Sequence, residues 1–187
     1  MRFEARQWVP FPVELVFAFF ADPRNLPRLM PPALGTRVEE LRLMPAQTEA
    51  AGAKLFADST ASGEGSEIRI SFRPVPFLPL RMSWLARITE FEWNSHFKDE
   101  QVRGPFATFR HRHGTLPESR NGKAGTLVTD EIDYALPFGL LGRLVSPLVE
   151  HQLQRSFAQR QERLPQMLAD LGKNSSCSST SGALIPE

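Results

Sequence analysis

The sequence has almost no cysteine and no excess of charge of one sign. Its single cysteine, Cys177, excludes a disulfide within the chain and fits a reducing compartment, so we expect a cytoplasmic protein. The 22 basic and 21 acidic residues leave a net charge of +1. Composition therefore gives no electrostatic reason to expect a nucleic acid or an anionic membrane as the main partner.

Long hydrophobic runs are also missing. No stretch of about 18 uncharged apolar residues occurs, so we expect no transmembrane segment. The apolar stretch at 9–21 follows two arginines, as in a secretory signal. Two prolines and Glu14 interrupt it, which argues against that interpretation.

What the sequence contains instead is a succession of strand patterns. Alternating apolar and polar residues predict a first strand at 2–9 and a last one at 125–136. Between them the predicted strands are 36–43, 67–72, 80–88, 96–102 and 106–116. The strand at 80–88 would place Leu80, Met82 and Trp84 on one face, and PESRNG at 117–122 reads as a turn.

Helical periodicity is confined to two regions. Two short helices are predicted after the first strand, one opened by Pro12 and one through 23–30. A long amphipathic helix is predicted from Ser146 and Pro147 to about Leu171, with a kink at Pro165. Its apolar stripe consists of Val149, Leu153, Phe157, Leu164 and Leu168.

This order of elements predicts an α+β fold. A curved antiparallel sheet of about seven strands, apolar on one face, can wrap round one long helix. We expect a single domain over residues 1–171, followed by a disordered Ser-rich tail over 172–187.

The chain resembles the START-like helix-grip (SRPBCC) superfamily, and within it the bacterial polyketide cyclase/dehydrase-like ligand-binding branch. The segments that carry the resemblance are FEARQWVPFPVELVFAFFADPRNLPRLMPP, LPLRMSWLARI, FKDEQVRGPFATFRHRHGTL, TLVTDEIDYALPFGLLG and the closing helix. The resemblance implies an apolar cavity between sheet and helix. Relatives carry lipids, sterols or quinones, or cyclise or dehydrate polyketides, and the fold does not choose among these activities.

We therefore expect a hydrophobic or amphipathic small molecule, lipid-, quinone- or polyketide-like, as the partner, with no cofactor. The first alternative is a cyclase or dehydratase, although the sequence matches no short catalytic motif of such enzymes. The second alternative is a protein-interaction module without enzymatic activity.

The most informative motif is FRHRH, which places Phe109, His111 and His113 on one face of a strand. Pairing of Leu116 with Gly125 across the PESRNG turn would set His111 opposite Asp130. A register slip of two residues would keep the same faces and change the partners.

Three interpretations of these polar residues are open. His111, His113 and Asp130 offer a metal's nitrogen and oxygen ligands, and His111 with Asp130 also forms a general acid or base pair. The third interpretation, which we expect, is a satisfied polar pair that holds the sheet or orients a ligand without a metal.

The remaining predicted contacts are apolar. Aromatic residues on an inner face serve as core more often than as ligand contacts, but a cavity-forming fold favours contact. The predicted ligand-binding residues are Phe72, Met82, Trp84, Phe109, His111, His113, Asp130, Tyr134 and Phe157.

Three Pro-Phe dipeptides, beginning at Pro76, Pro105 and Pro137, fall in alternate connections of the strand meander. Alternate connections lie at the same end of a sheet, so these dipeptides should converge. They would either plug the core or form a gated entrance, or a surface that touches a membrane or a partner. The predicted rim residues are Phe77, Leu78, Phe106, Phe138 and Leu140.

Overall fold

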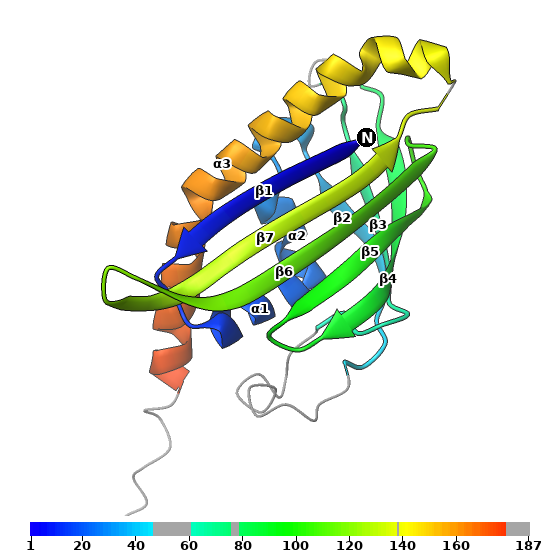
Figure 1. Ribbon diagram of the computed structural model, residues 1–187. Helices are drawn as coiled ribbons and strands as arrows, with labels where there is room; N and C mark the ends of the chain where they lie inside the picture. Colours follow the sequence, from blue (N-terminus) through cyan, green and yellow to red (C-terminus); the bar gives the residue numbers. More distant parts are fainter. Residues whose placement is uncertain (47–60, 76–78, 138, 179–187) are drawn as a thin grey trace, which may run out of the picture.

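The computed structural model describes residues 1–46, 61–75, 79–137 and 139–178. A seven-stranded antiparallel sheet curves round a long C-terminal helix, with two short helices after the first strand (Figure 1). The predicted α+β helix-grip fold is therefore confirmed. No helix within these ranges is long and apolar enough to span a bilayer.

The strands follow one another as hairpins, with one exception. Strand order is β1-β7-β6-β5-β4-β3-β2, so the first strand lies beside the last. The strands are β1 (Arg2–Val9), β2 (Arg37–Arg42), β3 (Glu67–Phe72), β4 (Met82–Glu92), β5 (His96–Arg103), β6 (Thr108–Arg120) and β7 (Lys123–Ala135). The helices are α1 (Val13–Ala21), α2 (Leu26–Leu29) and α3 (Leu140–Ser178), with short 3-10 turns at Pro23–Asn25 and Pro32–Leu34.

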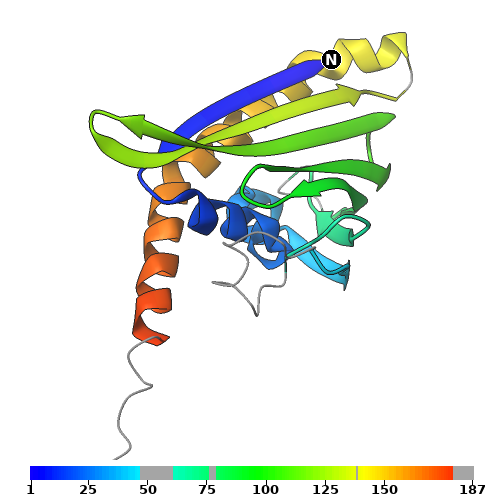
Figure 2. The same cartoon turned by 60° about the horizontal axis from the view of Figure 1, so that its bottom comes forward.

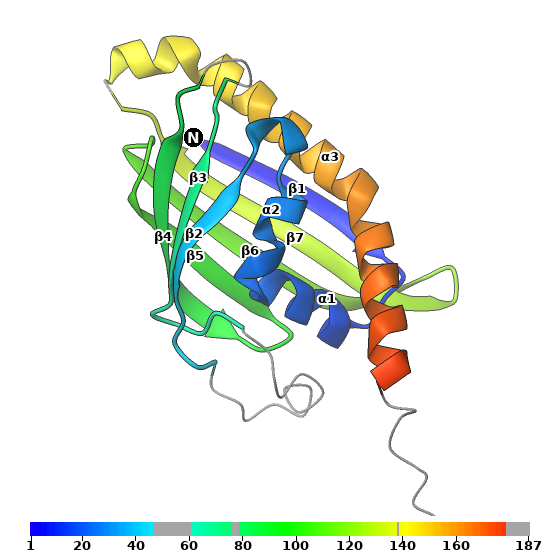
Figure 3. The same cartoon turned by 180° about the vertical axis from the view of Figure 1, so that it is seen from behind.

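All three α-helices lie on the concave face of the sheet, as Figure 3 shows from behind. The apolar spacing of α1 buries Val16, Phe17 and Phe20, and its end is marked by Asp22, whose carboxylate accepts a hydrogen bond from the Arg24 N–H. The main core cluster joins α1, β1, β7 and the second half of α3. Its buried members are Val9, Val16, Phe19, Phe20, Val128, Leu164, Met167 and Leu168.

The β6–β7 hairpin is longer than predicted. Pairing continues to Arg120 and Lys123, and the turn is only Asn121 and Gly122, both with positive φ (51° and 75°). Asn-Gly is the preferred sequence for such a two-residue turn, which twists in the sense that the strands need. The prediction that all of PESRNG forms the turn was therefore wrong.

The shorter turn moves the strand register by two residues. His111 lies opposite Ile132 and His113 opposite Asp130, so the predicted pairing of His111 with Asp130 was wrong. A shift of two residues preserves the period of the pleat, so each side chain stays on its predicted face.

Strand β4 and helix α3 also begin at residues other than the predicted ones. Strand β4 begins at Met82, and Leu80 is exposed before it instead of lying on the inner face. Helix α3 begins at Leu140, not at Ser146, and runs to Ser178; the rest of the Ser-rich tail lies outside the described residues.

Helix α3 contains two prolines, Pro147 and Pro165. Proline lacks the N–H that would continue the helical ladder, so helices bend where it occurs. Figure 2 shows that α3 changes direction along its length. This bending allows α3 to follow β1 and then reach α1. Gln7 and Gln161 hold it to β1, each donating its side-chain amide N–H to a backbone carbonyl across the gap (2.7 and 3.2 Å).

Candidate functional site

A network of charged side chains lies on the concave face, joining three strands to the long helix. Asp99 comes from β5, His111 and His113 from β6, Asp130 from β7 and Arg160 from α3. Asp130 and His113 are almost completely buried and Arg160 nearly so. Buried charges persist only when they are paired, so the charged groups of this network need counter-charges and hydrogen-bond partners within it.

His111 lies between two carboxylates. Its Nε2 is 2.8 Å from Asp130 Oδ1, and its Nδ1 is 3.3 Å from Asp99 Oδ2. A neutral imidazole can donate from only one nitrogen, whereas the imidazolium donates from both. Burial alone would lower the pKa of His111, but the hydrogen bonds to Asp130 and Asp99 raise it to about 9. His111 is therefore a cation at neutral pH.

His113 has a different environment. Its ring packs between Phe20 and Phe97, with centroids 4.0 and 5.1 Å away, and its Nδ1 lies 3.0 Å from Asp130 Oδ1. Burial lowers the pKa of His113, so the ring is neutral and donates from Nδ1. Its Nε2 is buried and has no partner among the described residues.

Arg160 completes the network. Its Nη1 donates to Asp130 Oδ1 at 3.0 Å, its Nη2 donates to Oδ2, and its guanidinium lies 4.4 Å from the Phe157 ring centre. Burial would raise the pKa of Asp130, but the Arg160 charge and the two histidines hold it well below its usual range. The negative charges of Asp99 and Asp130 are thus balanced by the positive charges of Arg160 and His111.

This balance bears on the metal interpretation. Donor atoms of His111, His113 and Asp130 lie within 4.8 Å of one another. Both oxygens of Asp130 already accept from Arg160, however, and a metal ion would sit against that fixed cation. The geometry therefore fits a charge-neutral anchor better than a metal centre.

Sequence reasoning missed Asp99 and Arg160. Arg160 stands at helical spacing between Phe157 and Leu164, inside the apolar stripe of α3, and Asp99 alternates with Phe97 on the inward face of β5. A charged residue at a core position needs a buried partner, and this signal could have identified both.

The aromatic residues predicted as ligand contacts form a second group, next to the network. The Trp84 ring centre lies 4.6 Å from that of Phe109, and the Phe106 ring centre lies 5.6 Å from that of Trp84 and 5.7 Å from that of Tyr134. The Phe157 ring is part of the same cluster and lies 6.3 Å from His111. The Phe72 ring centre lies 6.2 Å from that of Trp84 with the rings tilted, and Met82 begins β4.

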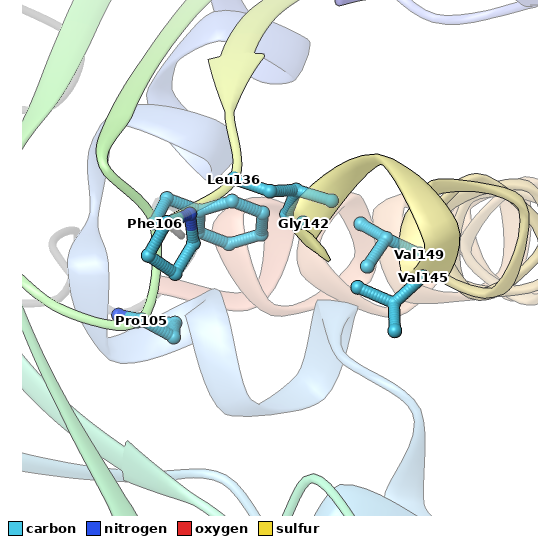
Figure 4. Close-up of a pocket in the computed structure, with 7 residues that line it drawn as sticks. Pro105, Phe106, Leu136, Gly142, Val145 and Val149 are labelled. Atoms are coloured by element: carbon cyan, nitrogen blue, oxygen red, sulfur yellow. The ribbon is translucent and has the colours of Figure 1, made fainter. Parts of the chain in front are cut away.

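An apolar pocket of about 350 Å³ opens beside this cluster (Figure 4). It lies between the β5–β6 connection, the β7–α3 connection and the first turns of α3. The lining residues are Pro105, Phe106, Leu136, Pro137, Gly142, Val145 and Val149. Three of them, Phe106, Leu136 and Val149, also pack on the aromatic cluster, which therefore forms the floor of the pocket.

The structure brings two of the three Pro-Phe dipeptides to this pocket, through Pro105, Phe106 and Pro137. Phe77, Leu78 and Phe138 lie outside the described residues, and Leu140 is the first residue of α3. None of the nine predicted ligand-binding residues lines the pocket itself; they lie deeper, in the aromatic cluster, in the charged network or along β3 and β4.

The concave face remains accessible near the charged network. The side chains of His111 and Asp99 keep 19% and 18% of their exposure. Solvent thus contacts the His111–Asp99 side of the network, while Asp130, His113 and Arg160 stay buried.

A sheet that wraps a long helix, with an apolar pocket at one end and polar side chains deeper inside, defines the START-like helix-grip class. A profile of one of its families, polyketide cyclase/dehydrase and lipid transport, matches residues 9–162. The chain belongs to this family. No curated protein sequence matches it significantly.

Solved structures share the fold at low sequence identity. A START superfamily protein from Mycobacterium smegmatis has a TM-score of 0.58 and 13% identity over 91% of this chain and 98% of that one. The protein TTHA0849 from Thermus thermophilus has a TM-score of 0.52 and 20% identity over 96% and 100%. Norcoclaurine synthase from Thalictrum flavum, in complex with dopamine and hydroxybenzaldehyde, has a TM-score of 0.54 and 14% identity over 88% and 85%. Likeness at these identities concerns the fold alone.

Proposed function

We propose that this protein binds a hydrophobic or amphipathic small molecule, with its apolar part in the pocket between the β5–β6 connection and α3. The observation that carries the proposal is the pocket itself, which is lined by apolar side chains and floored by the aromatic cluster. Its volume of about 350 Å³ falls at the lower end of the range for small-molecule sites. The family description, which includes lipid transport, supports the same class of ligand.

The charged network would orient a polar group of that ligand. Phe157 connects the two parts, because it packs in the same aromatic cluster as Val149 and lies against His111. A ligand that follows this path would bring its polar group to the exposed side of His111 and Asp99. Lipid-, quinone- and polyketide-like molecules all combine an apolar body with such a group.

The second candidate is a cyclase or dehydratase that uses His111 and Asp130 for proton transfer. The 2.8 Å contact between the two side chains favours it. Because both His111 nitrogens face carboxylates, His111 would act as the acid in such a reaction and not as the base. The norcoclaurine synthase complex supports the idea that this fold can hold small aromatic molecules.

The test is binding of the neutral probe N-phenyl-1-naphthylamine, measured by its fluorescence, together with native mass spectrometry for a molecule that copurifies with the protein. Val149→Trp fills the pocket and should reduce probe binding at least tenfold. Gln152→Trp adds the same ring to an exposed position of the same helix and should leave binding unchanged. Equal binding by the two variants would contradict the proposal and favour a protein-interaction module.

The two candidates differ in their response to His111→Gln. A binding protein should lose affinity for an amphipathic ligand and show no turnover. An enzyme should keep affinity for a polyketide-like substrate while its turnover falls.

A further inference from the structure

The end of the molecule that carries the pocket also carries an unusual set of exposed apolar side chains. On the first turns of α3, Leu144 is 78% exposed and Leu148 is 67% exposed, with Val145 also exposed beside them. Positions i, i+1 and i+4 lie on one side of a helix, so these three form a single apolar face. Exposed contiguous apolar surface of this kind marks a contact site.

The neighbouring connections extend this surface. The β3–β4, β5–β6 and β7–α3 connections lie at the same end of the sheet (Figure 1). Val75 and Leu80, in the β3–β4 connection, and Val102, at the end of β5, are exposed there. The apolar face of α3 thus belongs to a broader rim round the pocket mouth.

The charges of this rim have one sign. The three connections, with the start of α3, span residues 73–81, 103–107 and 136–149; their sequence contains the arginines Arg73, Arg81, Arg103 and Arg143 and no Asp or Glu. The first acidic residue of α3 is Glu150, directly after this stretch. In a chain with a net charge of only +1, such segregation sets the rim apart.

The described arginines of the rim differ in exposure. Arg103 is exposed, and Arg81 donates to the carbonyl oxygens of Gly35 and Ser71 and to the Ser71 hydroxyl. These direct partners of Arg81 are neutral, although the Ser71 hydroxyl also donates to the Glu39 carboxylate, so Arg103 is the most available cation among the described side chains of the rim. Leucine and valine side chains beside arginines are the combination that binds at a lipid–water interface.

We propose that the rim formed by the described residues of 73–81, 103–107 and 136–149 docks on the surface of an anionic lipid bilayer. Leu144, Val145 and Leu148 enter the acyl boundary, and the exposed Arg103 contacts the lipid headgroups. The pocket mouth, lined in part by Val145, then faces the membrane. This inference concerns the outer surface and stands on observations separate from those behind the proposed ligand site, although together they describe a ligand that passes between bilayer and pocket.

The experiment is cosedimentation of the full-length protein with two kinds of vesicle, one of phosphatidylcholine alone and one with about a quarter phosphatidylglycerol. We expect binding to the anionic vesicles, weakened at least tenfold by high salt, since salt screens the arginine charges. The double variant Leu144→Glu and Leu148→Glu should lose this binding at least tenfold.

The matched control is Leu116→Glu. Leu116 is also 55% exposed, but it lies on β6 in the hairpin that ends at Asn121 and Gly122, at the other end of the sheet. This variant should bind vesicles like the unchanged protein. Equal loss in both variants, or no binding to anionic vesicles, would overturn the inference.

Two further readouts separate the alternatives. N-phenyl-1-naphthylamine binding in solution should be unchanged by the Leu144 and Leu148 substitutions, so a failure of membrane docking and a failure of the ligand site can be told apart. Sedimentation velocity tests self-association; a dimer dispersed by the double variant would show that the rim binds a second copy instead, and would overturn the docking proposal.

Discussion

Arg160 of helix α3 binds both carboxylate oxygens of Asp130 on strand β7. This pair is the main polar connection between helix and sheet, and it is surrounded by the rings of Phe20 and Phe157. Because both charges are nearly removed from water, each depends on the other.

Replacing Arg160 should therefore destabilise the fold strongly. Arg160→Met keeps the apolar volume but leaves Asp130 buried without its main counter-charge, and we expect a loss of about 3 kcal/mol in the free energy of unfolding. Urea unfolding measures it. The control Arg163→Met changes an exposed arginine of the same helix and should have little effect. A comparable, small loss in both variants would show that Asp130 does not need Arg160.

Stability should fall as pH rises from neutral through about 9. The pKa of His111 is raised from 6.5 to about 9 in the folded protein, so the folded state holds this proton more tightly than the unfolded chain. The resulting stabilisation is complete below pH 6.5 and is lost as pH rises through about 9. Unfolding in urea across this range measures the slope.

The substitution His111→Gln should flatten that slope. His151→Gln, at an exposed position of α3, should leave it unchanged. His113 does not obscure the result, because burial lowers its pKa and its effect on stability is confined to lower pH. An equal slope in the His111 variant would mean that another group is responsible.

Gln101 should control the shape of the pocket wall. Its side-chain amide donates to the Phe106 carbonyl at 2.8 Å, and its side-chain oxygen lies 3.3 Å from the Phe106 N–H. Gln101→Leu removes both bonds, with an expected loss of about 1 to 2 kcal/mol in stability. Binding of N-phenyl-1-naphthylamine should weaken severalfold, because Phe106 is no longer held against the pocket.

The matched control for Gln101 is Thr89→Val. Thr89 makes a single long hydrogen bond, at 3.4 Å, to the Lys98 carbonyl in the same sheet, away from the pocket. The Thr89→Val variant should lower stability slightly and should leave probe binding unchanged. Unchanged probe binding in the Gln101 variant would show that Phe106 keeps its place without the clamp.

Gly122 tests the hairpin register. No atom lies within 4 Å of a Cβ at this position, but its φ of +75° disfavours any residue with a side chain. Gly122→Ala should therefore cost about 1 to 2 kcal/mol through backbone conformation alone. Thermal unfolding measures it, and Ser119→Ala, exposed on the same hairpin, should be nearly silent. A silent Gly122 variant would argue against the two-residue turn.

Much of this architecture could be predicted because it depends on local periodicity. The alternation in β3, β4 and β7 and the stripe of α3 report directly which face meets the core. The faces of Phe109, His111 and His113 followed from the same rule. The residues opposite them could not be predicted in this way, because the strand register depends on the length of the turn. The chain forms a two-residue Asn-Gly turn instead of the longer PESRNG turn.

The site itself was less predictable. The contact between His111 and Asp130 exists despite the wrong register, since diagonal neighbours on one face of a sheet remain within reach. Asp99 and Arg160 were missed because their partners lie far away in the sequence. A pocket depends on how α3 packs against the ends of the strands, and no local pattern reports that packing.

The order of the strands has a consequence for how the chain reaches this structure. Strand β1 is synthesised first, yet its neighbour among the described strands is β7, and the ion pair of Arg2 with Glu131 joins residues 129 positions apart. Closing so long a loop carries a large entropic cost and slows folding. Nearly the whole domain must therefore be synthesised before β1 can pair with β7. Until then both edges of β1 carry unpaired backbone N–H and C=O groups, which can pair with other chains and cause aggregation.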